Sequence, residues 1–439
     1  MGARETALNA LIACRKNGAW SNSVLKEYVR RDRLDPRDSA LAARLCYGVL
    51  QNRGKLDFYL GQLLKGSIKK LHPALRDILH LGLYQIYEMD RIPESAAVNE
   101  SVALVHKYCP RQSSAKGLVN GVLRNAVRMK GKLTEPTSYA DKYSHPDPLI
   151  SLLKESLPKG KLEPMLMADN QAPGMTVQTN TLKITTDRLR EILEGEGVTV
   201  RPHGWMPDCL VLEGTGSLEN LRSFQEGLYY VQDPAAKLSV LCAGLSSEDP
   251  SGILDCCAAP GGKSFACAIA TGNARPIVSC DIYPHKTELI AKGAQRLGLT
   301  AITAQVRNAA EPEESWKEAF SAVIADVPCS GYGIIRKKPD IRYKDPKAME
   351  DLPALQLQIL KTQAEYVKPG GVLLYSTCTV LKRENEAVVE AFLREDSRFS
   401  LEALPLPQGL PRNESGMLTL IPGEYDTDGF FICRLRRNV

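Results

Sequence analysis

Apolar residues at helical spacing dominate the first third of the chain. Asp35-Pro36 has the form of a helix N-cap followed by proline at the first helical position. His72-Pro73 precedes a second apolar stripe, and Ser95 is the expected cap of a third helix. This pattern predicts a compact all-α domain over residues 1–135.

The pattern becomes mixed between residues 143 and 245. Short strands are expected at 177–180, 198–200 and 229–232, and a helix at 185–195. These elements predict a small α+β domain over residues 143–245. The preceding polar stretch, 129–148, contains three prolines and is expected to be a linker.

Short apolar runs separated by helical stretches fill residues 246–439. The expected strands are 252–255, 277–280, 301–306, 322–325 and 371–375. This alternation predicts a Rossmann-like α/β domain, with a doubly wound, mostly parallel sheet covered by helices on both faces. Ligands of such sheets bind beyond the carboxyl ends of the strands, so functional residues are expected directly after them.

Charge is distributed unevenly along this three-domain pattern. Residues 1–140 contain 23 Lys and Arg against 12 Asp and Glu, a net charge of +11, whereas residues 141–439 carry a net charge of −6. A basic helical module joined to a mildly acidic remainder favours binding of a polyanion by the first domain. A solvated basic face is the alternative that charge alone leaves open.

Composition narrows the class of protein. With 44% hydrophobic and 24% charged residues, the 439-residue chain is ordinary globular protein, which excludes wholesale disorder. The sequence has no apolar run of about 18 residues and no signal-peptide core at its start, so we expect a cytoplasmic protein without a membrane span. Twelve cysteines and six histidines include no C-x-x-C pair, so no metal site is expected.

A glycine-rich turn, 255–264, follows the first strand of the predicted Rossmann-like domain. It ends in Gly-Lys-Ser like a phosphate loop, but Cys257 stands where a phosphate loop needs its first glycine. It also lacks the G-x-G-x-x-G fingerprint of dinucleotide sites. Asp281 ends the second strand and is placed to accept hydrogen bonds from a ribose. This combination favours S-adenosylmethionine over NAD, with a plain tight turn as the non-functional alternative.

Two cysteines follow two further strands. Cys329 lies in the run Asp326 to Ser330 after the fourth strand, and Cys378 follows the fifth. A single cysteine in such a position is most often a small buried apolar residue. Two thiols at one rim of a sheet, beside an aspartate, instead favour chemistry.

These runs resemble the RNA (cytosine-5) methyltransferase family. The residues that carry the resemblance are 256–263, Asp326-Val327-Pro328-Cys329-Ser330 and Ser376-Thr377-Cys378. The helical start is similar to NusB-type RNA-binding domains, through residues 76–85, 96–100 and 119–125. Runs at 143–146 and 226–233 are also family-like, so the resemblance covers essentially the whole chain.

The resemblance implies a multi-domain, S-adenosylmethionine-dependent RNA (cytosine-5) methyltransferase. Residues 1–135 would be a NusB-like RNA-binding domain, 143–245 a small RNA-binding or connecting domain, and 246–439 the methyltransferase domain. The implied partner is RNA, with 16S ribosomal RNA, free or in a partly assembled small subunit, as the expected substrate. A monomer is expected, with no membrane and no metal as partner.

The resemblance also implies roles for individual residues. Cys378 would be the nucleophile that attacks carbon 6 of cytosine, and Cys329 would aid its release. Asp326 would hold the N3/N4 edge of the base, and Lys263 would lie near a thiol or the base. The implied cofactor contacts are Cys257, Ala258, Ala259, Pro260, Gly261, Gly262, Lys263, Asp281, Asn308 and Asp326.

One position departs from the family pattern. The family usually has aspartate after the third strand, where it contacts the adenine amino group, whereas this chain has Asn308. The amide oxygen of Asn308 can still accept a hydrogen bond, so cofactor binding is expected to survive in a weaker form.

The basic stretch 332–343 is expected to contact phosphates beside the target base.

Two other classes of function remain open at this stage. One is a non-catalytic RNA-binding or ribosome assembly factor with a decayed methyltransferase domain, which Asn308 slightly favours. The other is an NAD-dependent oxidoreductase, which the missing glycine fingerprint disfavours.

For a cytosine methyltransferase, the target cytosine must leave its stack to reach a site between strand ends, so a structured RNA with an exposed cytosine is the favoured substrate.

Overall fold

A computed structural model describes residues 1–110, 112 and 114–439. It contains two compact units. The helical unit comprises Met1–Glu155, Leu166–Gln171 and Ile335–Pro346. The sheet unit comprises Ser156–Met165, Ala172–Ile334 and Lys347–Val439. No helix in the described part of the chain combines the length and apolarity that crossing a membrane requires.

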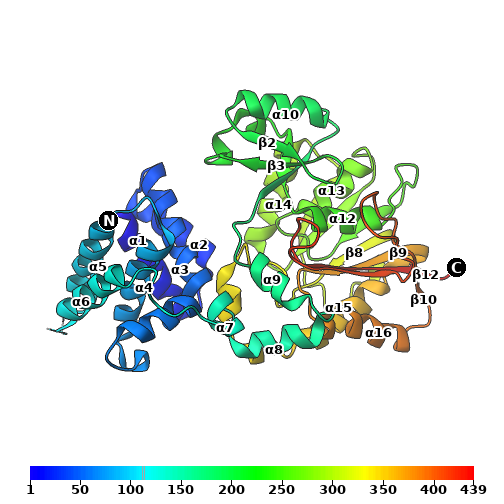
Figure 1. Cartoon of the computed structure of the whole chain (residues 1–439). Coiled ribbons are helices and arrows are strands. Elements are labelled where there is room, and N and C mark those ends of the chain that lie inside the picture. The colour runs from blue at the N-terminus through cyan, green and yellow to red at the C-terminus, as the bar shows by residue number, and fades with distance from the viewer. Residues whose placement is uncertain (111, 113) are drawn as a thin grey trace. The chain divides into compact units, whose positions relative to one another are not determined.

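Six helices build the core of the helical unit (Figure 1). They are α1 (Ala3–Asn17), α2 (Ser21–Asp32), α3 (Pro36–Leu63), α4 (Pro73–Glu88), α5 (Glu94–Tyr108) and α6 (Ala115–Arg128). The side chain of Asp35 accepts a hydrogen bond from the backbone N–H of Asp38, which confirms the predicted cap of α3. The prediction for Ser95 is wrong, because α5 begins one residue earlier, at Glu94. Leu8, Leu45 and Leu79 are fully buried between these helices.

The stretch 129–148, expected to be a linker, is partly helical. It contains α7 (Tyr139–Tyr143) and the start of α8 (Asp147–Ser156), and α9 (Leu162–Ala168) follows. Ser138 caps α7 by accepting a hydrogen bond from the N–H of Asp141. His145 is fully buried and its Nε2 lies 3.1 Å from Asp169 Oδ2. The prolines misled the prediction because Pro136 and Pro146 precede these short helices, and Pro148 lies in the first turn of α8, where a helix tolerates proline.

Residues 335–346, although they were expected to belong to the methyltransferase domain, pack within the helical unit. Arg342 is only 1% exposed. Its guanidinium donates to the carbonyl oxygens of Gln51 (3.1 Å) and Asp169 (3.2 Å) and to Asn170 Oδ1 (2.8 Å). The expectation that this basic stretch contacts RNA phosphates is therefore wrong for Arg342, whose two terminal guanidinium nitrogens donate to groups inside the protein.

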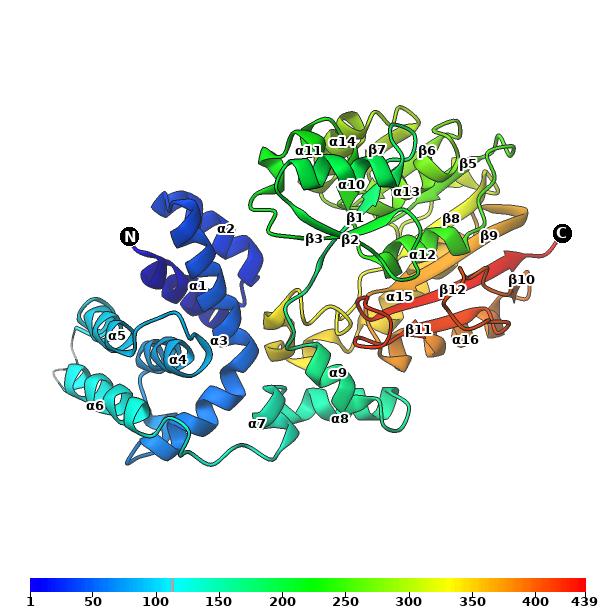
Figure 2. The same cartoon turned by 45° about the horizontal axis from the view of Figure 1, so that its top comes forward.

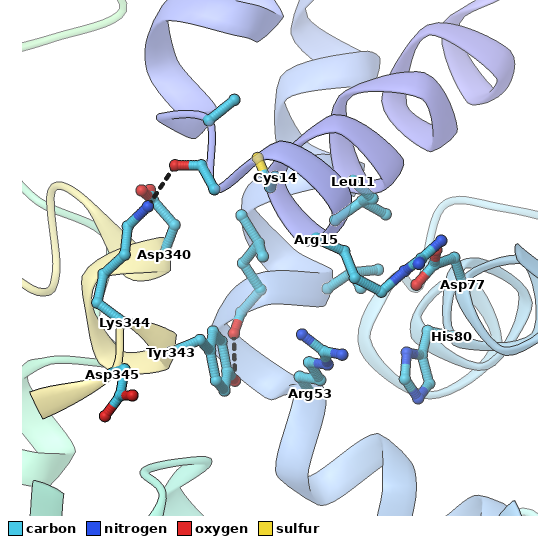
Figure 3. A pocket seen from close by; sticks show the side chains of 14 residues that line it. Leu11, Cys14, Arg15, Arg53, Asp77, His80, Asp340, Tyr343, Lys344 and Asp345 are labelled. Carbon is cyan, nitrogen blue, oxygen red and sulfur yellow. Dashed lines mark hydrogen bonds and ion pairs between the residues drawn. The ribbon is translucent and has the colours of Figure 1, made fainter. Parts of the chain in front are cut away.

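This segment lines a cavity of about 300 Å³ in the helical unit (Figure 3). Lys344 Nζ donates to the carbonyl oxygen of Gly18 at 2.5 Å. Arg15, on the opposite wall, bonds to Asp77 at 2.9 Å. Arg15 and Lys344 thus bond to groups of the protein itself, and none of the predicted catalytic residues lines the cavity.

The sheet unit contains a small antiparallel sheet of order β2-β3-β1-β4. Its elements are β1 (Met175–Thr179), α10 (Thr186–Gly195), β2 (Thr199–Pro202), β3 (Cys209–Glu213), α11 (Arg222–Gln225) and β4 (Tyr229–Val231). Three strands and one helix were expected here, and the structure contains them. Strand β3 was missed because its first four residues are all buried, so the run lacks the alternation that marks a half-buried strand.

The large sheet has the order β10-β12-β9-β8-β5-β6-β7, with β11 paired to β12. Its strands are β5 (Gly252–Asp255), β6 (Ile277–Asp281), β7 (Ile302–Val306), β8 (Phe320–Asp326), β9 (Val367–Thr377), β10 (Phe399–Leu401), β11 (Met417–Leu420) and β12 (Phe430–Arg437). Strands β7, β6, β5, β8 and β9 are parallel neighbours, whereas β12 runs antiparallel to β9. The predicted doubly wound, mostly parallel sheet is confirmed.

Helices cover both faces of this sheet (Figures 1 and 2). The helices are α12 (Pro234–Cys242), α13 (Gly262–Ala270) and α14 (Pro284–Leu297) on one face, and α15 (Leu352–Ala364) and α16 (Glu386–Glu395) on the other. Ile324 of β8 packs in the core beneath the first group, and its neighbour Val323 packs in the core of the second. Adjacent residues of a strand point to opposite faces, so this strand is buried on both sides.

Candidate active site

Asp326 and Lys263 meet at the carboxyl edge of the large sheet. Asp326 ends β8, and Lys263 lies in the first turn of α13, directly after the glycine-rich turn. Lys263 Nζ lies 2.6 Å from Asp326 Oδ2, and Ser376 Oγ donates to Asp326 Oδ1 at 2.8 Å. Burial lowers the pKa of Lys263, but the neighbouring Asp326 carboxylate outweighs it and the pKa is raised. These two donors hold the Asp326 carboxylate in one orientation.

Cys329 and Cys378 lie side by side at the same edge. Their sulfur atoms are 3.2 Å apart, and both side chains are partly exposed. The sheet explains this proximity, because β8 and β9 pair in parallel register with Asp326 opposite Ser376. The hydrogen bond with Cys378 and burial raise the pKa of the Cys329 thiol well above its usual value. The structure therefore brings together the two thiols that the sequence placed after different strands.

The glycine-rich turn between β5 and α13 is shaped by Gly261. Its φ of +111° lies in the region that favours glycine, and a Cβ there would lie 2.5 Å from the ring of Phe265. Asp255, just before the turn, is fully buried and accepts a hydrogen bond from Ser264 Oγ at 2.7 Å. Burial raises the pKa of Asp255 to about 6. The turn is thus a tight backbone cradle above a buried carboxyl group.

Asp281 ends β6 and is 7% exposed. Its Oδ1 accepts a hydrogen bond from the backbone N–H of Tyr283 at 3.1 Å, and its Oδ2 lies 3.7 Å from Lys286 Nζ. A carboxylate can accept about four hydrogen bonds, so Asp281 has capacity beyond these contacts.

Asn308, which follows β7, is bonded within its own loop. Its amide oxygen accepts from the N–H of Ala310 at 3.1 Å, and its amide nitrogen donates to Glu311 Oε1 at 2.9 Å. The oxygen keeps one further lone pair, so it can still accept a second hydrogen bond.

A buried polar cluster beside the thiols was not predicted from the sequence. Glu384 and Gln356 are fully buried, and the Glu384 carboxylate accepts a hydrogen bond from the backbone N–H of Ser330 at 2.9 Å. In the sequence Glu384 lies in a charged run, 382–386, which resembles a solvated turn. Only its closeness to Cys378 in the sequence could have identified Glu384 as a candidate site residue. Among the described residues no group of three or more His, Cys, Asp or Glu side chains could hold a metal ion.

Three family models match consecutive parts of the chain. The NusB family matches residues 1–128, and a ferredoxin-like domain of RsmF/B-like methyltransferases matches residues 145–219. The family described as 16S rRNA methyltransferase RsmB/F matches residues 243–436.

Curated relatives match over nearly their whole length. The probable ribosomal RNA small subunit methyltransferase B of Bacillus subtilis is 33% identical, over 99% of this chain and 98% of its own. The protein of the same name from Synechocystis is 34% identical over the whole of both chains. Ribosomal RNA small subunit methyltransferase B of Vibrio vulnificus is 32% identical over 98% of both chains.

Solved structures share the fold at lower identity. The crystal structure of PH0851 has a TM-score of 0.81, with 22% identity over 98% of both chains. NSun6 from Pyrococcus horikoshii has a TM-score of 0.59 and 20% identity, over 66% of this chain and 98% of that chain.

Proposed function

The chain belongs to the 16S rRNA methyltransferase RsmB/F family, and we propose that it transfers a methyl group from S-adenosylmethionine to carbon 5 of a cytosine in 16S ribosomal RNA. The observation that carries the proposal is the pair of thiols 3.2 Å apart, beside the ion-paired Asp326, at the carboxyl edge of the sheet. We further propose a NusB-like RNA-binding domain at 1–135, a connecting domain at 143–245 and a methyltransferase domain at 246–439. The protein would act as a cytoplasmic monomer.

The residues of the glycine-rich turn fit S-adenosylmethionine. Gly261 lets the turn lie tightly against the ring of Phe265, where a Cβ would clash, and Asp255 Oδ1 beneath the turn is buried without a hydrogen-bond partner among the described residues. When bound, the cofactor supplies a methyl group on a positively charged sulfur. The residues proposed to hold it are Cys257, Ala258, Ala259, Pro260, Gly261, Gly262, Lys263, Asp281, Asn308 and Asp326.

Replacing Gly261 with alanine is expected to weaken S-adenosylmethionine binding at least tenfold. The new Cβ would lie 2.5 Å from the ring of Phe265 in a left-handed backbone conformation, so the cradle must distort. Titration calorimetry measures the effect. Gly272→Ala is the matched control. Gly272 also has a positive φ and lies just after α13, the helix that Gly261 precedes, but a Cβ there would have open space around it. Equal affinities for both variants would contradict a cofactor role for this turn.

Carbon 5 of cytosine is too weak a nucleophile to accept a methyl group unaided. In the proposed reaction the Cys378 thiolate adds to carbon 6, which forms a sulfur–carbon bond and makes carbon 5 nucleophilic. After carbon 5 has taken up the methyl group, a base removes its proton, the sulfur–carbon bond breaks and the thiolate leaves. Cys329, whose sulfur lies 3.2 Å from that of Cys378, is proposed to assist this release.

Asp326 is proposed to hold the base for this addition. Its carboxylate, oriented by Lys263 and Ser376, would accept a hydrogen bond from the N4 amino group and stabilise the charge that develops along the N3/N4 edge. Lys263 is proposed to supply positive charge at this edge of the sheet, close to the reacting thiol.

The proposed function is tested by incubating the protein with 16S ribosomal RNA and methyl-labelled S-adenosylmethionine. Digestion to nucleosides and mass spectrometry are expected to find the label in 5-methylcytidine. Label in a different nucleoside would contradict the proposed position of transfer, and no label would contradict the activity.

A second candidate function is a non-catalytic assembly factor that binds RNA. The observation in its favour is the Asn308 side chain, which is bonded on both its oxygen and its nitrogen within its own loop. Calorimetry separates the two candidates, because an assembly factor with a decayed site would bind RNA but release no heat with S-adenosylmethionine.

A further inference from the structure

A fully buried carboxylate lies beneath the two thiols. Glu384 belongs to a 3-10 turn, Lys382–Glu384, that follows Cys378 and precedes α16. Among the interactions of the described residues, none pairs Glu384 with a basic side chain. Burying a carboxylate without such a partner is costly, so this side chain is expected to have a specific purpose.

The Glu384 side chain binds the loop that carries Cys329. Its Oε2 accepts hydrogen bonds from the backbone N–H of Ser330 at 2.9 Å and from Gln356 Nε2 at 3.0 Å. Gln356 Nε2 also donates to the carbonyl oxygen of Pro328 at 2.9 Å. The residues on both sides of Cys329 are therefore held by one buried carboxylate and one buried amide.

The same turn binds the loop that carries Cys378. The carbonyl oxygen of Glu384 accepts a hydrogen bond from Tyr375 Oη at 2.6 Å. The next residue, Asn385, bonds to Thr377 Oγ1 at 2.6 Å and donates to the carbonyl oxygen of Thr379 at 3.0 Å. The residues on both sides of Cys378 are thus held by this turn as well.

We propose that Glu384 is a positioning residue, which clamps the Cys329 loop onto the Cys378 loop and so sets the distance between the two thiols. This inference rests on the proposed function for its catalytic consequence, but not for the geometry itself. A further hydrogen bond, between Ser330 Oγ and Thr379 Oγ1 at 2.9 Å, joins the two loops directly. Parallel pairing of β8 and β9 brings the loops near each other, and the Glu384 clamp fixes their final separation.

The negative charge of Glu384 also affects the Cys329 thiol, whose pKa it helps to raise. The hydrogen bond with Cys378, burial, and the negative charges of Cys378, Glu384 and Asp326 all raise the pKa of Cys329. The nearby Lys263 cation is bonded to Asp326. A protonated Cys329 beside Cys378 suits a group that donates a proton or a hydrogen bond rather than one that attacks the base.

The separation of the thiols can be measured without methyl transfer. Diamide, a thiol oxidant, takes two electrons and two protons from a pair of thiols, forms a disulfide and becomes a hydrazine. The rate of Cys329–Cys378 disulfide formation, followed by peptide mass mapping of the full-length protein, therefore reports how closely the two sulfurs are held.

Glu384→Leu is expected to slow this oxidation at least tenfold, because leucine cannot accept the bonds from Ser330 and Gln356. Glu384→Gln keeps an acceptor oxygen and is expected to restore the rate to within about threefold of the native protein. The matched control is Glu390→Gln, which removes an exposed carboxylate from the adjoining helix α16 and should leave the rate unchanged. The same variants are expected to rank in the same order in kcat, with the KM for RNA within twofold.

Oxidation of the Glu384→Leu variant within twofold of the native rate would overturn the proposal. Should leucine prevent folding, as judged by thermal melting, Glu384→Asp takes its place, since it shortens the side chain by one methylene and must lengthen the bond to Ser330. If neither the native protein nor its variants methylate RNA, but oxidation is still slowed in the Glu384→Leu variant, the clamp is upheld and only the proposed function is contradicted.

Discussion

Replacing Cys378 with alanine is expected to abolish methyl transfer, with a loss in kcat of about 10⁴-fold or more. Without a thiolate to add at carbon 6, carbon 5 of cytosine never becomes nucleophilic enough to accept a methyl group. The remaining thiol, Cys329, cannot substitute readily, because its pKa is raised well above the usual value by the hydrogen bond with Cys378 and by burial. Incorporation of labelled methyl groups into 16S ribosomal RNA measures the loss.

Cys14→Ala is the control for this prediction. Cys14 is a half-buried thiol of α1 in the helical unit, and its loss should leave the rate within about twofold. Binding of S-adenosylmethionine should be unchanged in the Cys378→Ala protein, which distinguishes lost chemistry from lost structure. Transfer near the native rate in that protein would show that another group attacks the base.

Replacing Cys329 with alanine is expected to produce a different failure. The Cys378 thiolate can still add to the base, but release is slowed, so a covalent protein–RNA complex should accumulate and turnover should stop after about one cycle. Denaturing gel electrophoresis detects such a complex, because a sulfur–carbon bond survives detergent. The expected yield is a large fraction of the protein, compared with a trace for the native enzyme.

The double variant Cys329→Ala/Cys378→Ala is the matched control for adduct formation. It carries the same change at position 329 but lacks the proposed nucleophile, so it should form no complex. Normal turnover of the single Cys329→Ala variant, without an adduct, would contradict the assistance that Cys329 is proposed to give.

The sequence predicted the part of the fold that local patterns determine. Parallel strands β5 to β9 are buried on both faces, and their short apolar runs and intervening helices were recognisable. Strand β11 was missed although it pairs with the nearby β12. Strands β10 and β12 were not predicted, because β10 pairs antiparallel with β12 and β12 with β9, which are distant in the sequence. Pairing with a strand about 60 residues away leaves no signal within a short window.

The candidate site, like the fold, could be predicted from the sequence only in part. Cys329 and Cys378 could be placed at one edge because each follows a parallel strand, and such strands end together. The Glu384 clamp could not be foreseen, since its burial results from contacts with Ser330 and Gln356 that are 54 and 28 residues away. For Arg342 the error is the opposite one: a contact with RNA phosphates was predicted, but the side chain is buried and donates to backbone carbonyls.

The proposed reaction depends on a covalent bond between the sulfur of Cys378 and carbon 6 of the target cytosine. The most direct test is mass spectrometric mapping of the peptide and nucleotide joined in the complex that the Cys329→Ala protein forms with RNA. We expect a single cross-linked peptide containing Cys378, attached to a cytosine that already carries the transferred methyl group. A nucleotide attached to any other residue, with the Cys378 thiol unmodified in the same complex, would contradict it.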